Sequence, residues 1–225
     1  MASLQNTIYW INVKGPKQLA TLNLIKGTKV LNEKLVKKDG QEYRIWNPFR
    51  SKLGAAIING IEIMPITDTS KVLCIGITNC VTISHISDIV KNGKVFCVEP
   101  SVIKAQYLLN KVTSKRKNVI TIKGDFRDPK NYSPKPEKVD VVYVDVPVTD
   151  KADIAILNCK EHLQSDGYCI MVIETSSISL TKEPSNENQE NIRKFRSSSF
   201  EIIQEIPLIN YHYTYSIIIT KWENE

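Results

Sequence analysis

The fold is decided by the stretch Val72-Leu-Cys-Ile-Gly-Ile-Thr-Asn-Cys-Val-Thr-Ile-Ser-His-Ile-Ser-Asp88. It begins with four apolar residues, a run of the length that buried strands have. Gly76 follows, where the chain turns from strand to helix. Ile83, Ile86 and Ile89 then recur at the spacing of one helix face. The stretch therefore predicts a buried strand, a turn and a helix.

Outward from this stretch, strand-like and helix-like segments continue to alternate. Further apolar runs that indicate mostly buried strands are Lys94–Val98, Val119–Ile122, Val139–Val144, Tyr168–Ile173, Glu201–Ile206 and Tyr213–Thr220. From Ala152 to Leu163, apolar residues recur at the i, i+3, i+4 and i+7 spacing of a helix. This alternation predicts an α/β fold with a doubly wound parallel sheet, and any ligand would bind over the carboxyl ends of its strands.

The first part of the chain has shorter apolar runs that indicate a small antiparallel sheet. These runs are Ile8–Val13, Leu19–Ile25, Lys29–Leu31 and Glu42–Trp46. Asp39-Gly40 predicts a hairpin, because a type I′ turn needs positive φ, which Gly tolerates and Asp accepts. We expect a small N-terminal β domain over residues 1–46 and a larger domain over residues 47–225.

Composition favours a globular intracellular protein. The 225 residues are 42% hydrophobic and 24% charged, enough for a full core and a solvated surface. No apolar run is long enough to span a bilayer, and the N-terminal residues lack the pattern of a signal peptide. The five cysteines form no Cys-x-x-Cys pair and lie mostly in apolar runs. They are predicted to be buried free thiols, with no metal site or disulfide framework.

The net charge of +6 allows an anionic partner such as RNA, but many proteins carry as much. Two basic clusters could contact phosphates: Lys34 with Lys37 and Lys38, and residues 115–117. For either cluster taken singly, a solvated loop is the favoured interpretation. Charge alone therefore does not decide the function.

Two segments together resemble a known family. Tyr43-Arg-Ile-Trp-Asn-Pro-Phe-Arg-Ser-Lys-Leu53, followed by residues 72–88, is similar to the fibrillarins, the RNA 2′-O-methyltransferases of box C/D ribonucleoproteins, in their short archaeal form. The resemblance covers most of the chain. It implies the seven-stranded, Rossmann-like sheet of class I S-adenosylmethionine-dependent methyltransferases, with one antiparallel strand. It also implies a heterodimer with a Nop-family scaffold protein, which holds the subunit over guide RNA together with a kink-turn-binding protein.

The cofactor loop departs from the family. Where the family reads Gly-Ala-Ala-Ser-Gly-Thr-Thr, this chain reads Gly76-Ile-Thr-Asn-Cys-Val-Thr82, so only Gly76 and Thr82 match. Such a loop lets its backbone approach the methionine part of S-adenosylmethionine, which favours small side chains. Ile77, Cys80 and Val81 are expected to crowd the loop. A positive φ would be costly at Cys80, and Val81 removes a hydroxyl.

Two acids nevertheless favour a retained cofactor pocket. Glu99 matches the residue that hydrogen-bonds the cofactor ribose, and one carboxylate can accept from both ribose hydroxyls. Asp125 matches the Asp that lies beside the adenine amino group. An acid at a strand end is also commonly a solvated or capping residue. Two alternatives therefore remain at this point: the protein binds S-adenosylmethionine, or it has no cofactor.

The catalytic positions are half retained. The family uses a Lys-Asp-Lys-His or Lys-Asp-Lys-Glu set, in which Lys52 matches the first Lys and Asp145 matches the Asp. Glu174 stands at the second Lys, and Tyr215 stands at the fourth position. Glu174 exchanges a cation for an anion where an alkoxide would form, which opposes the chemistry.

Two further readings of these positions are open. His212 could substitute at the fourth position only if the strand register shifts, because a strand places His212 and Tyr215 on opposite faces. Glu174 could form a structural ion pair with Lys52, which would preserve the fold without the activity. We favour a catalytically degenerate fibrillarin paralogue, a structural subunit of a box C/D-type particle that meets RNA through the complex.

The alternative is an active S-adenosylmethionine-dependent RNA 2′-O-methyltransferase that acts on rRNA or tRNA through Lys52, Asp145 and His212. A nucleotide-dependent oxidoreductase is disfavoured, because residues 75–80 lack the G-x-G-x-x-G order. The two main hypotheses differ in whether the cofactor binds and a methyl group is transferred.

Overall fold

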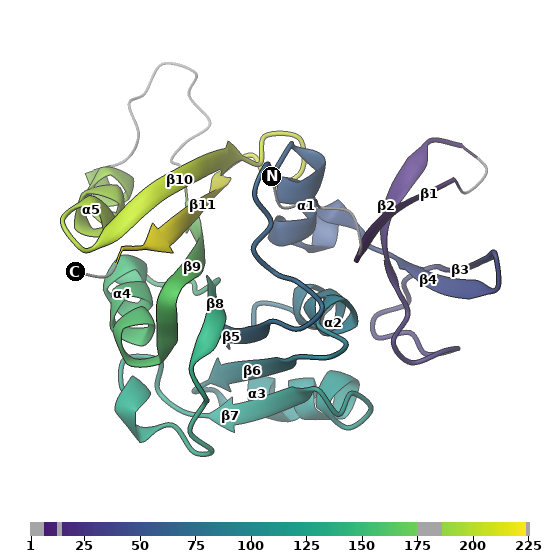
Figure 1. Cartoon of the computed structure of the whole chain (residues 1–225), viewed down its shortest axis with the longest axis horizontal. Coiled ribbons are helices and arrows are strands. Elements are labelled where there is room, and N and C mark those ends of the chain that lie inside the picture. The colour runs from purple at the N-terminus through teal and green to yellow at the C-terminus, as the bar shows by residue number, and fades with distance from the viewer. Residues whose placement is uncertain (1–6, 13–14, 175–185, 224–225) are drawn as a thin grey trace.

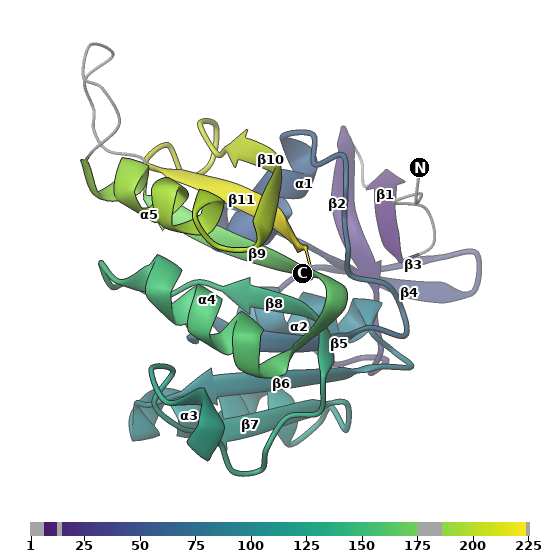
Figure 2. The same cartoon turned by 60° about the vertical axis from the view of Figure 1, so that its left-hand side comes forward.

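The computed structural model describes residues 7–12, 15–174 and 186–223. Within them, a seven-stranded sheet carries helices on both faces, and a four-stranded antiparallel sheet stands beside it (Figures 1 and 2). No helix of this described part is long and apolar enough to cross a membrane. The predicted fold class is confirmed.

The elements have the following bounds. The small sheet contains β1 (Ile8–Asn12), β2 (Lys17–Leu22), β3 (Leu35–Lys38) and β4 (Gln41–Ile45). The large sheet contains β5 (Lys71–Ile75), β6 (Lys94–Glu99), β7 (Val119–Lys123), β8 (Val139–Val144), β9 (Leu163–Glu174), β10 (Phe200–Pro207) and β11 (Tyr215–Trp222). The helices are α1 (Lys52–Ile58), α2 (Cys80–Ile89), α3 (Val102–Leu108), α4 (Lys151–His162) and α5 (Asn186–Arg196), with short turns η1 (Pro48–Arg50), η2 (Leu109–Thr113) and η3 (Pro129–Asn131).

The large sheet has the strand order β10-β11-β9-β8-β5-β6-β7. Strands β7, β6, β5, β8 and β9 are parallel, and β11 is antiparallel to both of its neighbours. The carboxyl ends of the parallel strands consequently meet at one edge, where β11 begins. The topology therefore gathers residues from distant parts of the sequence at this edge.

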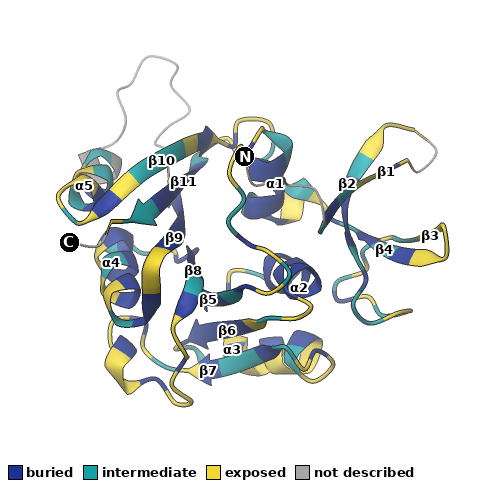
Figure 3. Cartoon of the chain, in the orientation of Figure 1, coloured by how far each residue is buried: buried dark blue, intermediate teal, exposed yellow. Residues whose placement is uncertain are grey.

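Each central strand buries both of its faces, which is why its sequence is continuously apolar. In β5, Val72 and Cys74 pack against one layer, and Leu73 and Ile75 pack against the other. The first layer contains α1 and α2, and the second contains α4 and α5. Figure 3 shows the central strands in the colour of buried residues. The side chains thus alternate with the strand period of two.

The five cysteines are all free and buried, which confirms the prediction that they are buried thiols. They are Cys74, Cys80, Cys97, Cys159 and Cys169. Burial raises the pKa of the Cys80 thiol to about 11. A thiol with a raised pKa is a weak nucleophile, so Cys80 is a packing residue of α2.

The predicted hairpin is present in the small sheet. Asp39 and Gly40 have φ angles of 50° and 73°, and Lys38 pairs with Gln41 across the turn. The predicted strand at Lys29–Leu31 is wrong, because these residues form a loop. In that loop the backbone N–H groups of residues 30 and 31 donate to the Glu33 side chain rather than to a neighbouring strand.

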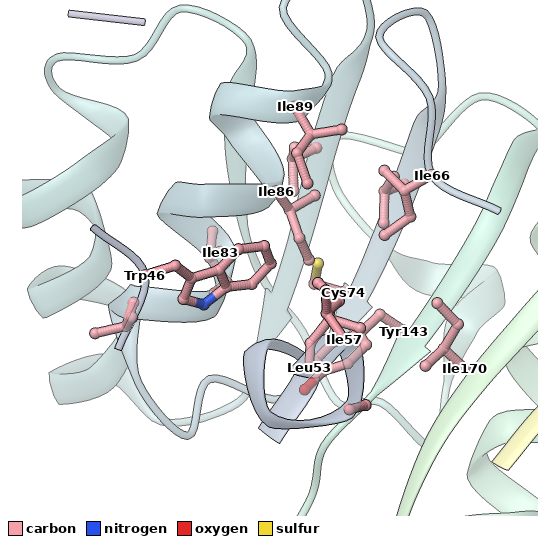
Figure 4. Packing of buried hydrophobic residues seen from close by; sticks show 14 of the residues in the cluster. Trp46, Leu53, Ile57, Ile66, Cys74, Ile83, Ile86, Ile89, Tyr143 and Ile170 are labelled. Atoms are coloured by element: carbon pink, nitrogen blue, oxygen red, sulfur yellow. The ribbon is translucent and has the colours of Figure 1, made fainter. Parts of the chain in front are cut away.

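The small sheet shares its core with the large one. Leu19 of β2 and Trp46, just after β4, belong to the same buried cluster as α1 and α2. Figure 4 shows Trp46 near Ile83 of α2. A Cβ on Gly54 would lie 2.8 Å from Trp46 Nε1, so the α1 backbone packs directly on the indole. The division of the chain at residues 46 and 47 stays a prediction.

A buried charge cluster ties the small sheet to α2. Asp88 of α2 accepts hydrogen bonds from Arg44 Nη1 at 2.8 Å, Arg116 Nη1 at 2.5 Å and Thr21 Oγ1 at 2.8 Å. The side chains of Arg44 and Asp88 have no solvent exposure. The suggestion that residues 115–117 offer a cluster of cations to phosphates is therefore wrong for Arg116, because its side chain is committed to Asp88.

Candidate active site

A cavity of about 200 Å³ lies at the carboxyl edge of the large sheet. Asp145 follows β8, Glu174 ends β9 and Tyr215 begins β11. These three residues line the cavity together with Lys52, the first residue of α1. The structure therefore brings together the four positions that the resemblance implies for the catalytic set.

The local sequence before α1 fixes the position of Lys52. Asn47 accepts from the backbone N–H of Phe49 and so caps η1, and Ser51 accepts from the N–H of Gly54 and caps α1. The Ser51 hydroxyl also lies 2.8 Å from Thr82 Oγ1 in the first turn of α2. The two helix starts are therefore joined by a buried hydrogen bond, and Lys52 enters the cavity from a rigid cap.

Lys52 and Asp145 form a close ion pair. Lys52 Nζ donates to Asp145 Oδ1 at 2.8 Å and lies 4.4 Å from the centre of the Tyr215 ring. Thr78 Oγ1 donates to the other oxygen of Asp145 at 2.7 Å. Burial, followed by the Asp145 charge, raises the pKa of the neighbouring Tyr143 hydroxyl well above its usual value. Both carboxylate oxygens of Asp145 are thus occupied by donors.

Glu174 does not form the predicted ion pair with Lys52. The ammonium of Lys52 is bound by Asp145 instead, and Glu174 is exposed at the rim of the cavity. Glu174 is the register partner of Tyr215 across β9 and β11. The cavity therefore carries an anion at the second-lysine position that Lys52 does not neutralise directly.

His212 lies outside this cavity. Strand β11 begins at Tyr215 rather than at residue 213, because the N–H of Tyr215 donates to the His212 carbonyl in a turn. The prediction that a strand places His212 and Tyr215 on opposite faces therefore does not apply, because His212 lies before the strand. Its Nε2 lies 2.9 Å from the Pro48 carbonyl oxygen. Burial lowers the pKa of His212, and Lys52 lowers it further. The structure does not bring His212 into the cavity with Lys52 and Asp145.

Two of the predicted cofactor residues have packing roles in the loop. Gly76 has a φ of 83°, and a Cβ there would lie 2.6 Å from Val146 Cγ1 and 2.7 Å from the Asp145 carbonyl oxygen. A larger residue at position 76 would collide with the residues that follow β8, so glycine is required there. Thr82 is buried, and its hydroxyl bonds to Ser51 as described above.

The two predicted acids are engaged by backbone groups. Glu99 is only 3% exposed, and its two oxygens accept from the N–H groups of Ile77 at 2.9 Å and Ser101 at 3.0 Å. Asp125 is exposed, and it accepts from the N–H of Arg127 at 2.9 Å in a turn. Glu99 thus binds the backbone of the loop that follows β5 and of the segment that precedes α3.

The altered loop packs differently from the prediction in one respect. Cys80 is the first residue of α2 and is not among the described residues with positive φ, so the expected backbone cost at this position is absent. Ile77, Cys80 and Val81 are instead buried in the core that contains α1 and α2. Asn79 caps α2 by accepting from the N–H groups of Val81 and Thr82.

A second cavity of about 350 Å³ adjoins this loop. Its lining includes Ile77, Cys80 and Tyr107, and of its lining residues only Thr78 also lines the 200 Å³ cavity. Glu99 and Asp125 line neither of the two cavities. Thr78 is thus the residue at which these two cavities meet.

The sequence analysis missed two residues of the cavity. Thr78 was counted only as part of the loop, yet it binds Asp145 and separates the two cavities. Lys151, the first residue of α4, is 5% exposed and lines the same cavity as Lys52. Among the described residues, none forms a hydrogen bond or an ion pair with the Lys151 ammonium. A lysine that directly precedes a predicted helix, six residues after Asp145, is the signal that could have identified it.

The strand order, the single antiparallel strand and the site at the carboxyl edge define the S-adenosylmethionine-dependent methyltransferase fold, which the solved structural neighbours share. Within that fold class, the fibrillarin family model matches residues 2–224. The chain belongs to the fibrillarin family.

Individual relatives agree with this assignment. The chain is 40% identical over 212 residues to the fibrillarin-like rRNA/tRNA 2′-O-methyltransferase of Saccharolobus islandicus, which covers 93% of this chain and 90% of the relative. Aeropyrum pernix fibrillarin, solved with natively bound S-adenosyl-L-methionine, has a TM-score of 0.90 and 33% identity, with 95% and 94% of the two chains covered. A chain of a fibrillarin/Nop5p complex has a TM-score of 0.82 and 29% identity, with 96% and 98% covered.

Proposed function

We propose that this chain is a catalytically degenerate fibrillarin, a structural component of a box C/D-type ribonucleoprotein that pairs with a Nop-family scaffold protein. The observation that carries the proposal is Glu174 at the rim of the cavity that holds the Lys52–Asp145 pair. An anion in this lining opposes the negative charge that develops on an alkoxide, where the family's lysine would stabilise it.

The cofactor loop supports the same conclusion. Glu99 is buried against the N–H of Ile77, and Thr78 stands between the two cavities. Ile77, Cys80 and Val81 are bulkier than the family residues at these positions, which leaves less room for S-adenosylmethionine. The loss therefore affects cofactor binding as well as the catalytic set.

The relatives support the assembly role. The similar chains include rRNA/tRNA 2′-O-methyltransferases and a fibrillarin solved together with Nop5p. A subunit that works only in a complex should expose apolar side chains when it is isolated. Here Phe49, Ile209 and Tyr213 are 64%, 68% and 66% exposed. RNA would then be contacted through the complex. The net charge of +6 would attract the RNA phosphates.

Co-expression with the Nop-family proteins of its own source tests this proposal. Size-exclusion chromatography with light scattering should show a stable 1:1 heterodimer. The purified heterodimer should then transfer no methyl group from labelled S-adenosylmethionine to guide-paired RNA, while an active archaeal fibrillarin serves as the control. A chain that stays monomeric beside every such scaffold, or a heterodimer that methylates RNA, would refute the proposal.

Lys151 favours a second candidate, an active RNA 2′-O-methyltransferase. It places a second ammonium group in the cavity, where the family lysine has been replaced by Glu174. On this hypothesis the Lys-Asp-Lys set would consist of Lys52, Asp145 and Lys151. Comparison of the unmodified heterodimer with its Lys151→Met variant distinguishes the two candidates. Transfer that Lys151→Met abolishes would support the second candidate, and absence of transfer in both proteins would exclude it.

A further inference from the structure

The start of α4 lacks the side-chain cap that three other helices have. Ser51, Asn79 and Ser101 accept from backbone N–H groups at the starts of α1, α2 and α3. Asp150 occupies the same position before α4, but its side chain accepts from no N–H of the helix. Its two oxygens accept instead from Nε and Nη2 of Arg127, each at 2.8 Å. The ion pair with Arg127 thus leaves this helix start uncapped.

Three backbone N–H groups at the start of α4 therefore lack an acceptor. Among the described residues, no acceptor binds the N–H groups of residues 151–153. The N–H of Ile154 is the first to be bound, by the Asp150 carbonyl at 3.1 Å. Such N–H groups, together with the dipole of a helix of 12 residues, favour an anion at this point.

Lys151 adds an ammonium group without a partner to this helix start. Its side chain lines the cavity of about 200 Å³ at the carboxyl edge of the large sheet, and the residue is 5% exposed. None of the described residues forms a hydrogen bond or an ion pair with the ammonium. Burial of an ammonium without an anion is costly. Thr149 and Lys151, on either side of Asp150, both line the cavity, so an anion there would lie close to the start of α4.

The acids around this helix start leave room for a bound anion. Asp145 is paired with Lys52 at 2.8 Å, and Asp153 in the first turn of α4 is paired with a lysine of α5. Glu174 also lines the cavity, but it is exposed at the rim. Water and salt screen an exposed charge more strongly than a buried one. The buried ammonium of Lys151 is therefore screened less than the opposing charge of Glu174.

We propose that Lys151 and the start of α4 form a binding site for a phosphate group, and that this phosphate belongs to an RNA nucleotide. Lysine side chains and helix N-termini both bind phosphate groups. The cavity of about 200 Å³ is smaller than the roughly 300–1,000 Å³ of pockets that enclose whole small molecules, so it fits one group of a larger molecule. No bond is made or broken at this site. The assignment of RNA rests on the proposed function, whereas the phosphate site itself does not.

Titration of the full isolated chain with inorganic phosphate at constant ionic strength tests the site. The backbone amide NMR signals of residues 151–153 should shift saturably with phosphate and should not shift with chloride. Lys151→Met should weaken binding about tenfold or more, because a charge-assisted hydrogen bond is lost. Lys151→Arg keeps the cation and should retain most of the affinity. Lys160→Met is the matched control, because Lys160 is an exposed lysine of the same helix.

Two further measurements on the isolated chain have opposite signs. Glu174→Gln should strengthen phosphate binding, because it removes the anion at the rim. Phosphate should raise the melting temperature of the unmodified chain but not that of Lys151→Met, since only a folded chain with the site gains from the ligand. Circular dichroism establishes that each variant is folded.

The heterodimer with the scaffold protein tests RNA as the source of the phosphate. Lys151→Met should weaken RNA binding and should reduce the slope of log affinity against log salt by about one, as the loss of one phosphate contact does. Lys160→Met should leave the slope unchanged. If the chain binds inorganic phosphate but Lys151→Met changes neither RNA affinity nor the slope, the site takes a free phosphate, and the assignment of RNA is overturned.

The remaining outcomes separate this inference from the proposed function. If the amides of residues 151–153 do not respond to phosphate, or respond equally in Lys151→Met, the phosphate site is wrong and the proposed function stands. If the heterodimer does not form, the proposed function is wrong, and RNA as the source of the phosphate falls with it. The titration of the isolated chain still decides the phosphate site in that case.

Discussion

Lys52 Nζ lies 2.8 Å from Asp145 Oδ1, although the two residues are 93 positions apart in the sequence. Their side chains are 16% and 6% exposed, so the ion pair is mostly shielded from water. A shielded pair of this kind holds α1 against the end of β8 whether or not the site reacts. The retained half of the catalytic set thus has a structural role in addition to any catalytic one.

The unmodified chain is expected to bind S-adenosylmethionine more weakly than about 1 mM, which corresponds to under about 4 kcal/mol. Glu99 is buried, and Thr78 donates to Asp145 where the two cavities meet. Ile77→Ala combined with Thr78→Ala should join the two cavities and strengthen binding measurably in isothermal titration. Thr149→Ala, which lines only the smaller cavity, is the matched control. Low-micromolar binding by the unmodified chain would contradict this prediction.

Methyl transfer should be restored only by a combined change. Glu174→Lys and Tyr215→His return the cations of the catalytic set, and residues 76–82 must also be returned to Gly-Ala-Ala-Ser-Gly-Thr-Thr. Each change alone should do little, because catalytic groups that act as a unit are not additive. Transfer of a labelled methyl group to RNA by the heterodimer measures the result. Recovery with Glu174→Lys alone would show that the loop was never limiting.

Asp88→Asn should destabilise the chain by roughly 3–5 kcal/mol, because it removes the anion that Arg44 and Arg116 share and leaves the buried Arg116 guanidinium without an anionic partner. Asp88 accepts from both Arg44 and Arg116, and none of the three side chains is more than 1% exposed. Urea unfolding monitored by circular dichroism gives the change. Glu137→Gln is the control, because Glu137 pairs with lysines at the surface, and it should have no measurable effect. Equal effects of the two variants would contradict the role assigned to the buried cluster.

Stability should fall as the solution becomes acidic, in part through His85. Burial, followed by the charges of Arg44 and Arg116, lowers the pKa of His85 well below 6.5. The unfolded chain therefore binds this proton first, and stability is full above pH 6.5 and declines below it. His85→Gln should reduce the slope of unfolding free energy between pH 5 and 6.5 by up to about 1.4 kcal/mol per pH unit. Identical slopes in the two proteins would show that His85 does not titrate on unfolding.

Local sequence determined much of the fold. The hairpin at Asp39-Gly40 follows from backbone preferences within two residues. The continuous apolar runs of the parallel strands follow from burial on both faces, and each predicted strand of the large sheet is found within a few residues of its expected bounds. The resemblance placed Lys52, Asp145, Glu174 and Tyr215 at catalytic positions, and these four residues do line one cavity.

Tertiary structure alone decided what these side chains contact. Lys52 is paired with Asp145 rather than Glu174, and His212 lies in a turn against Pro48. Thr78 and Lys151 enter the site only because β5, β8 and α4 end at the same edge of the sheet. Sequence periodicity records which face of an element is buried, and this depends on residues a few positions apart. The contacts of a site depend instead on strand order and on the direction of each side chain, which are set by packing between segments far apart in the chain.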